Sequence, residues 1–303
     1  MRDPKMTNTQ PAITASPVTS SSATITVRMA VRGNIIERHE VDDVLNIVET
    51  RMRSTTVSGL AIGSVNLDHL HHFGEDDTLG RQPGLEWLLL ADGMPIAWRG
   101  QLLTAQPWPR VTGADLLPRI LMLAELSGYR VGFLGGSPQT HKRLAAQLAI
   151  RNPDLAVAGM WSPDRHELDT DSATIAEAIR AAGTDILVVS LGKPRQEKWV
   201  SEFGRATRAR LILPFGASVD FLAGTRQRAP EWMQRFGLEW LYRLSREPRR
   251  LARRYLIQGP AALVHLVRAQ AASSPGRYYP APEINAAVDS DPRSTIAFHT
   301  TAL

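Results

Sequence analysis

Asp92 is the residue whose type and position point most directly to chemistry. It follows an apolar run at 86–91 (EWLLLA) that predicts a buried strand. The carboxyl ends of strands in an open α/β sheet face the crevice where ligands bind, and a carboxylate there can remove a proton from a hydroxyl. Asp92-Gly93 is also a common turn dipeptide. The local sequence therefore leaves two interpretations of Asp92, a residue of a ligand site or a turn residue.

Glycine ends three other predicted strands immediately before a turn, at Gly135, Gly192 and Gly216. Glycine lets a ligand approach the backbone closely, and the helix that follows presents N–H groups at its N-terminus. Several such junctions along one sheet edge predict a site for an anion, most naturally a nucleotide diphosphate. No G-x-G-x-x-G follows a strand and no Walker A sequence is present, so the sequence lacks the signatures of dinucleotide-binding and P-loop proteins.

Positive charge is concentrated near the C-terminus. The range 226–268 holds ten arginines and three glutamates, a net +7, whereas the whole chain carries +5. After Pro248, four arginines spaced i, i+1, i+4, i+5 are expected on one side of a helix, at Arg249, Arg250, Arg253 and Arg254. Such a helix suits an anionic lipid surface. The alternatives are a solvated charged face and nucleic-acid binding, for which no recognised motif accompanies the arginines.

Two patterns raise the question of a metal site, and neither has the expected context. His69, His71 and His72 lie close together, but no fourth ligand stands at a suitable spacing. Asp169-Thr-Asp171 has the form Asp-x-Asp but precedes a predicted helix, so helix capping is the better interpretation. The chain has no cysteine, which excludes thiolate ligands, disulfides and cysteine nucleophiles. We predict no metal site and no other cofactor.

The elements that must position these residues follow a repeated strand–helix pattern. With 303 residues, 43% of them hydrophobic, the chain can bury a full core. The pattern predicts a Rossmann-like α/β fold, with a mostly parallel sheet and helices on both faces. Strands are expected at 59–65, 86–91, 129–134, 155–160, 185–191 and 211–213, and helices at 41–53, 115–126, 139–150, 172–182 and from 196. The range 100–109, rich in proline and tryptophan, is expected to be a loop over a pocket.

Composition divides the chain into four parts: a Ser/Thr/Pro-rich tail expected to be disordered, an α/β core, a basic helical region and a second Pro/Ser-rich tail, at 1–24, 25–225, 226–270 and 271–303. In the basic region, large apolar residues recur every four positions and predict one helix with an apolar stripe, at Trp232, Phe236, Trp240 and Leu244. No apolar run approaches the roughly 20 residues that span a bilayer, and the N-terminus lacks the apolar core of a signal peptide. Any membrane contact is therefore expected to be peripheral.

The motifs occur in an order that resembles a known family. They are Asn66 after a strand, Ala91-Asp92-Gly93, Arg110-Val-Thr-Gly-Ala-Asp115-Leu116, Leu134-Gly135-Gly136, Leu191-Gly192-Lys193-Pro194-Arg195-Gln196-Glu197, Phe215-Gly216-Ala217, Asp220-Phe221, Ala223-Gly224, Arg228-Ala229-Pro230, Gly237-Leu238-Glu239-Trp240 and Arg243. Each motif is short, but their joint order is specific. Together they resemble the bacterial WecG/TagA/CpsF glycosyltransferases, family 26, over about two thirds of the chain, 59–255.

This resemblance implies an inverting glycosyltransferase of bacterial surface or exopolysaccharide biosynthesis. It would move a sugar from a UDP-sugar donor to a polyprenyl-diphosphate-linked saccharide acceptor, without a metal ion. The range 25–225 would bind the nucleotide sugar, and 226–270 would dock on the inner, cytoplasmic face of the plasma membrane. The alternative is a UDP-sugar-binding enzyme or sensor of another class on the same core. The sugar, the acceptor and the oligomeric state, including a homo-oligomer, are left open.

The resemblance also assigns roles to individual residues. Asp92 matches the position of the catalytic base, and Arg110 matches an arginine suited to a bidentate phosphate contact. Ser64 and Asn66 fall where family members carry Thr-x-Asn near the sugar, with serine replacing threonine. The residues expected to bind the nucleotide are Gly135, Gly136, Gly192, Gln196 and Asp220. Those expected at the membrane or the acceptor phosphate are Arg243, Arg249, Arg250, Arg253 and Arg254.

Overall fold

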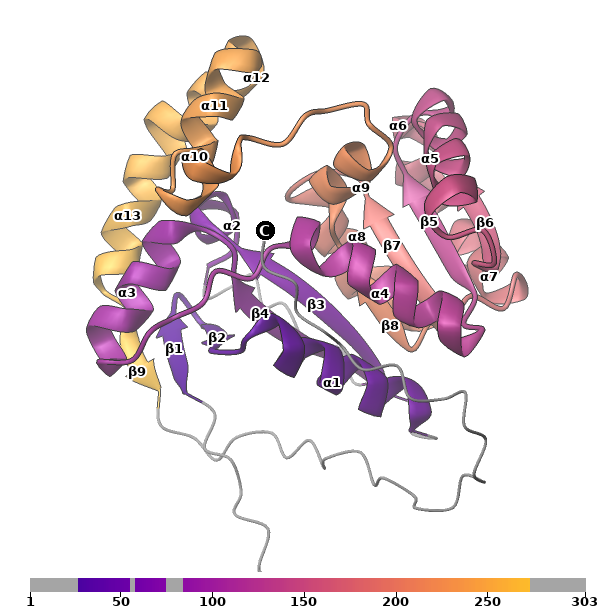
Figure 1. Ribbon diagram of the computed structural model, residues 1–303, viewed down its shortest axis with the longest axis horizontal. Coiled ribbons are helices and arrows are strands. Elements are labelled where there is room, and N and C mark those ends of the chain that lie inside the picture. Colours follow the sequence, from indigo (N-terminus) through magenta and orange to yellow (C-terminus); the bar gives the residue numbers. More distant parts are fainter. Residues whose placement is uncertain (1–26, 55–57, 75–83, 273–303) are drawn as a thin grey trace, which may run out of the picture.

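One nine-stranded sheet organises the residues that the computed structural model describes, 27–54, 58–74 and 84–272 (Figure 1). The strands lie in the order β6-β5-β7-β8-β3-β4-β2-β1-β9. All neighbouring pairs from β6 to β2 are parallel, and β1 is antiparallel to both β2 and β9. The bounds are β1 Arg28–Val31, β2 Asn34–Glu37, β3 Gly59–Val65, β4 Leu85–Ala91, β5 Val131–Gly135, β6 Val157–Trp161, β7 Ile186–Ser190, β8 Leu211–Leu213 and β9 Gln270–Ala272. The predicted mostly parallel α/β fold is confirmed.

Helices cover both faces of this sheet. They are α1 Val41–Arg53, α2 Leu67–His72, α3 Met94–Thr104, α4 Gly113–Ser127, α5 Pro138–Arg151, α6 Arg165–Thr170, α7 Ser172–Ala181, α8 Arg195–Phe203, α9 Gly216–Leu222, α10 Glu231–Arg235, α11 Glu239–Arg246, α12 Pro248–Ala252 and α13 Gly259–Val267, with the short 3₁₀ helix η1 Gly204–Thr207 and the π-helix η2 Arg253–Gln258. Along β3, Leu60 and Ile62 enter the core beneath α1 and α4, whereas Ala61 enters the core on the opposite face. A strand covered on both faces has no polar side, which explains its unbroken apolar sequence.

Two helices that border the site begin at residues whose side chains hold the first turn. The Asn66 side chain accepts a hydrogen bond from the backbone N–H of His69 at the start of α2, at 3.2 Å. The Thr112 hydroxyl accepts one from the N–H of Asp115 at the start of α4, also at 3.2 Å. Side-chain caps of this kind satisfy N–H groups that have no partner within the helix. Both caps follow directly from polar residues placed just before an apolar helical pattern.

The loop predicted at 100–109 is wrong in its first half, because α3 extends to Thr104. Pro95 lies in the first turn of α3, where a proline costs no hydrogen bond, and the buried residues Ile96 and Ala97 hold the helix to the sheet. Gly100 leaves room for the Trp108 ring, whose nearest atom lies 2.2 Å from where a Cβ would stand. The tryptophan and prolines that suggested a loop form only the connection after α3.

The single helix predicted from 230 to 244 is also wrong. Gly237 adopts φ +70° and separates α10 from α11, so the expected apolar stripe is broken. Neither α10 nor α11 has a buried residue, and Trp232 and Phe236 remain 57% and 72% exposed. The four-residue spacing correctly indicated helical structure in this region, but it did not show that a left-handed glycine divides it into two helices.

The chain returns to the sheet after these helices. Figure 1 shows α10 to α13 gathered on one side of the molecule, next to α3 and β9. Ala262 and Leu266 of α13 are buried in the same core as α2 and α3, and β9 pairs with β1. The predicted tail at 271–303 therefore begins with the end of a strand, and its remainder, like the tail at 1–24, lies outside the described residues.

Candidate active site

A polar cleft of about 430 Å³ opens at the carboxyl ends of the central parallel strands. The chain runs from β3 to β4 on one side, and β8, β7 and β5 lie on the other side of β3. Residues at or just after the strand ends on both sides of this reversal line the cleft, among them Ser64, Asn66, Asp92, Gly136, Gly192 and Gly216. Such a switch point is where ligands bind in open α/β sheets.

The glycine turns contribute to this cleft in different ways. Gly136 and Gly192 line it with φ of +84° and +76°, a conformation that favours glycine. Gly135 is not among the lining residues. Its φ is +90°, and a Cβ there would stand 2.6 Å from the carbonyl oxygen of Ser190. Gly135 is therefore required for packing between two strands rather than for an approach to the cleft, unlike the other two glycines.

Asp92 and Asn66 form a hydrogen-bonded pair at the ends of adjacent strands. Asn66 Nδ2 donates to Asp92 Oδ2 at 3.1 Å, while Asn66 Oδ1 accepts the N–H of His69. The helix cap thus fixes the Asn66 amide with its nitrogen toward the carboxylate. Asp92 Oδ1 makes no hydrogen bond to the described part of the chain, so it is available to accept a proton from a ligand hydroxyl.

A second cleft of about 330 Å³ adjoins the first. Its walls are the starts of α2 and α3, together with α11, η2 and α13, and they carry apolar side chains, among them Leu67, Met94, Trp240, Tyr255 and Leu263. The residues that line both clefts are Asn66, Asp92, Glu239, Arg243 and Arg254. Asp92 therefore stands where a polar cleft and an apolar cleft meet.

Ion pairs connect the C-terminal helices to the core around this junction. Arg254 Nη2 lies 3.2 Å from Oδ2 of the buried Asp68, and Arg110 Nη1 lies 3.3 Å from Glu239 Oε2. Arg110 lines the apolar cleft and not the polar one. Among the predicted site residues, Arg110 is thus the one that lines the apolar cleft alone.

The five C-terminal arginines do not share one location. Arg243, Arg250 and Arg254 line the polar cleft, whereas Arg249 and Arg253 are exposed and line neither cleft. The helical spacing predicted a single basic side, but the π-helix η2 and the contacts with α2 divide the set between cleft and surface.

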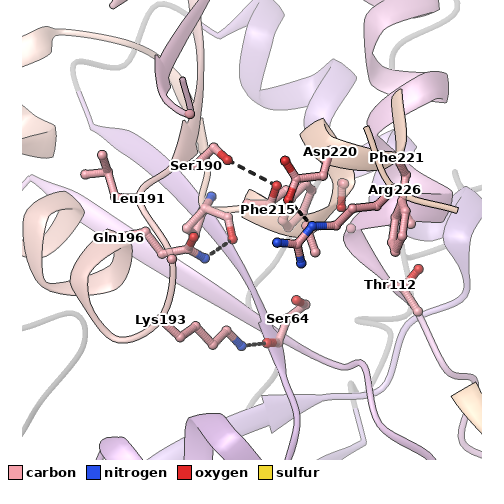
Figure 2. A pocket seen from close by; sticks show the side chains of 18 of the residues that line it. Ser64, Thr112, Ser190, Leu191, Lys193, Gln196, Phe215, Asp220, Phe221 and Arg226 are labelled. Carbon is pink, nitrogen blue, oxygen red and sulfur yellow. Dashed lines mark hydrogen bonds and ion pairs between the residues drawn. The ribbon is translucent and has the colours of Figure 1, made fainter. Parts of the chain in front are cut away.

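The residues expected to bind a nucleotide are partly engaged within the protein. Gln196 is buried, and its Nε2 donates to the carbonyl oxygen of Pro214 at 2.6 Å. Asp220 pairs with Arg226 at 3.2 Å (Figure 2). Burial raises the pKa of Asp220, and the Arg226 guanidinium opposes that rise. Both residues line the polar cleft.

Other lining residues were absent from the sequence-based prediction. Ser190 and Lys193 border the turn after β7, and their place next to Gly192 was a usable signal. Arg226 and Glu239 come from the C-terminal region, and no local pattern distinguished them from neighbouring charges. Within the described ranges, no group of three histidine, aspartate or glutamate side chains is arranged to hold a metal ion. Over the same ranges, no helix is both long enough and apolar enough to cross a bilayer.

The mostly parallel sheet with helices on both faces places the protein in the class of Rossmann-like α/β proteins, in which anionic ligands such as nucleotides bind at the carboxyl edge of the sheet. Family comparison is more specific. The model of the "Glycosyl transferase WecG/TagA/CpsF family" matches residues 29–275, so the chain belongs to this family, and the predicted resemblance is confirmed.

One relative is N-acetylglucosaminyldiphosphoundecaprenol N-acetyl-beta-D-mannosaminyltransferase of Bacillus subtilis (strain 168). The two proteins are 28% identical over 195 residues, which is 64% of this chain and 73% of the relative. Family and relative together identify the protein as a glycosyltransferase.

Proposed function

We propose that the protein transfers a sugar from a UDP-sugar to a polyprenyl-diphosphate-linked saccharide, with inversion at the sugar carbon and Asp92 as general base. The observation that carries this proposal is the place of Asp92 on the wall shared by the two clefts. A base that deprotonates the acceptor hydroxyl must stand where the acceptor meets the donor sugar, and this carboxylate borders both spaces.

The chemistry of each cleft supports one substrate. The polar cleft, with its glycine turns and cationic side chains, suits the UDP moiety. The apolar cleft, with Trp240 and Tyr255, suits a sugar ring and the first part of a lipid chain, since aromatic side chains offer both stacking area and a polar edge. The named relative acts on an N-acetylglucosaminyl-diphospho-polyprenol, which fits an acceptor with these two parts.

The reaction is a single displacement. Asp92 Oδ1 takes the proton of the acceptor hydroxyl, whose oxygen forms a bond to the anomeric carbon of the donor sugar. The bond from that carbon to the β-phosphate oxygen breaks on the opposite face, and its electron pair leaves with UDP. Asn66 holds the carboxylate in position through its 3.1 Å hydrogen bond, so the base is oriented before the substrates arrive.

We further propose that transfer needs no metal ion, because arginine and lysine side chains and backbone N–H groups in the polar cleft can neutralise the leaving diphosphate. Turnover is expected to be unchanged in EDTA. Loss of turnover in EDTA with recovery on addition of manganese would contradict this part of the proposal.

The protein is proposed to act as a peripheral protein on the inner face of the plasma membrane. Exposed apolar side chains lie on η2 and α13 as well as α10, including Leu256, Ile257, Val264 and Val267 with Trp232 and Phe236. Exposed arginines accompany them at Arg249 and Arg253. This combination of apolar and basic groups is typical of segments that rest in a bilayer interface.

The test is a donor screen with purified full-length protein and a synthetic N-acetylglucosaminyl-diphosphate carrying a short polyprenyl chain. UDP-N-acetylmannosamine is the first donor to try, in view of the relative, followed by UDP-glucose, UDP-galactose and UDP-N-acetylglucosamine. A disaccharide product linked with inverted anomeric configuration supports the proposal. UDP binding without transfer to any lipid acceptor would favour the alternative, a UDP-sugar-binding enzyme or sensor of another class.

A further inference from the structure

Lys193 crosses the polar cleft from the turn between β7 and α8. Its ammonium donates to the carbonyl oxygen of Ser64 at 2.7 Å (Figure 2), and its side chain is only 11% exposed. An ammonium group has three N–H donors, and Ser64 takes one of them. Lys193 therefore keeps donors for a ligand while one hydrogen bond fixes the position of its charge.

The origin of the other positive charges in this cleft makes Lys193 distinctive. Within the described part of the chain, the remaining cationic side chains that line it all come from the segment after Gly224, and they are Arg226, Arg243, Arg250 and Arg254. Three of these arginines have carboxylate partners, which are Asp220, Glu247 and Asp68. Lys193 is thus the cation that the α/β core itself places in the cleft.

The carboxylate nearest to Lys193 is that of Glu197, 3.8 Å away on the next turn of α8. Glu197 is 2% exposed, and its Oε2 has no hydrogen-bond partner among the described residues. Burial raises the pKa of Glu197, which the Lys193 ammonium opposes. The 3.8 Å separation is beyond hydrogen-bond distance, so Glu197 leaves the remaining N–H donors of Lys193 unused.

We propose that Lys193 is a further catalytic residue, whose ammonium contacts the diphosphate of the bound donor and stabilises the charge on the departing UDP. This inference rests on the proposed function. As the sugar–oxygen bond breaks, its electron pair stays on the β-phosphate oxygen, and a preplaced ammonium stabilises that charge without a metal ion. The competing explanation is that Lys193 only ties the turn after β7 to the end of β3.

Substitutions can separate the two roles of Lys193, the charge that it offers to the diphosphate and the hydrogen bond that it makes to Ser64. Lys193→Gln removes the charge but keeps an N–H donor for the Ser64 carbonyl, whereas Lys193→Arg keeps the charge. Lys198→Gln, at an exposed position of α8, the helix that follows this turn, is the matched control. Dissociation constants for UDP and for uridine are measured by titration calorimetry, because only UDP carries the diphosphate.

Lys193→Gln is expected to weaken UDP binding about tenfold or more, the usual effect of losing a hydrogen bond to a charged group, and to leave uridine binding unchanged. Lys193→Arg should retain most of the UDP affinity, and Lys198→Gln should match the wild type. Turnover of Lys193→Gln at saturating donor should fall as well, because the leaving-group charge is greatest in the transition state.

A second measurement uses the wild-type protein and does not depend on a folded variant. UDP should protect Lys193 from amine acetylation by acetic anhydride, read by peptide mass spectrometry, and uridine should not; Lys198 is the internal reference. Equal protection by UDP and uridine, or equal loss of both affinities in Lys193→Gln, would overturn the inference in favour of a structural tie. Unchanged UDP binding by Lys193→Gln would refute the inference alone, whereas failure of the wild type to bind UDP would refute the proposed function as well.

Discussion

The α/β core and the C-terminal segment after Gly224 contribute to one site by different physical means. Strands β3, β4, β7 and β8 bury apolar side chains on both faces, and the core delivers Asp92 and the glycine turns through the backbone ends of these strands. Helices α10 and α11 bury no residue, and arginines dominate what this segment brings to the cleft. The core thus positions Asp92 and the glycine turns, and the C-terminal segment provides most of the positive charge that lines the cleft.

This difference indicates which contacts hold each region in place. Apolar burial over a whole sheet is worth far more than a few partly exposed ion pairs. Two such ion pairs join α11 and η2 to the core, Arg254 with Asp68 and Arg110 with Glu239. The end of the segment is different, because α13 and β9 are packed into the core. A truncation after Gly224 would therefore damage the core too, and point substitutions are the sharper tool.

The largest effect is expected from the core. Asp92→Asn should lower kcat about a thousandfold, since general bases contribute factors of that order, while UDP binding and the free energy of unfolding stay near the wild-type values. Steady-state kinetics with saturating donor and acceptor measure the effect. Asp169→Asn, at an exposed position of α6, is the control and should be fully active. Near wild-type transfer by Asp92→Asn would rule out the base assignment.

The next effect tests the tie between the regions. Arg254→Met removes the partner of Asp68, whose side chain is only 7% exposed, and should lower the free energy of unfolding by about 1–3 kcal/mol. Urea unfolding followed by tryptophan fluorescence measures the change, with Arg253→Met on the neighbouring exposed arginine as the control. Adding Asp68→Asn to Arg254→Met should recover part of the loss. If Arg254→Met and its control Arg253→Met unfold at the same urea concentration, the Arg254–Asp68 pair does not hold the segment to the core.

The same contrast explains how far the sequence could predict the structure. The helix at 41–53 and the strand at 59–65 have the predicted bounds, because a continuous apolar period sets them locally. The predictions for α3 and α10–α11 are wrong because a single glycine decides the structure in each: Gly100 leaves room for the Trp108 ring, and the left-handed Gly237 ends a helix. The apolar pattern of the sequence predicts an element well where it is continuous. It predicts poorly where a single residue determines whether a helix continues or ends.

The residues of the candidate site also differ in how far the sequence could locate them. Asp92, Asn66, Gly136 and Gly192 could be found because strand ends in a parallel sheet converge on one edge. Gly135, with the same sequence context as Gly136, serves packing instead, and only the carbonyl of Ser190 beside it reveals this. No periodicity indicates that arginines far along the chain will turn back to the cleft, because that return depends on ion pairs with residues distant in sequence.

A smaller effect should appear in the pH dependence of stability, at the helix between the two regions. His69 of α2 is fully buried, and burial lowers its pKa well below the ordinary 6.5, with Lys193 adding to the shift. Below pH 6.5 the unfolded chain binds a proton at this residue that the folded protein does not, so acid favours unfolding. The free energy of unfolding should fall by up to about 1.4 kcal/mol per pH unit until the folded-state pKa is reached. It should not change above pH 6.5 on account of His69.

Urea unfolding at a series of pH values measures this slope. His69→Phe, which places an apolar ring next to Phe73, should make the curve flatter below pH 6.5 than that of the wild type. His166→Gln, at an exposed position of α6, is the control and should leave the curve unchanged. Parallel curves for wild type and His69→Phe would mean that another group causes the acid sensitivity.

The smallest effect separates the surface arginines from those of the cleft. Arg249→Gln and Arg253→Gln should each weaken binding to vesicles containing anionic lipid about fivefold, since both side chains are exposed and each basic group adds a modest attraction to the headgroups. Neither change should alter UDP affinity. Arg250→Gln should weaken UDP binding and leave vesicle binding unchanged, because Arg250 lines the polar cleft. Sedimentation with vesicles and UDP titration measure the two properties, and Arg151→Gln on α5 is the control. If all four variants bind vesicles equally, Arg249 and Arg253 form a solvated face, and membrane docking must depend on apolar contacts alone.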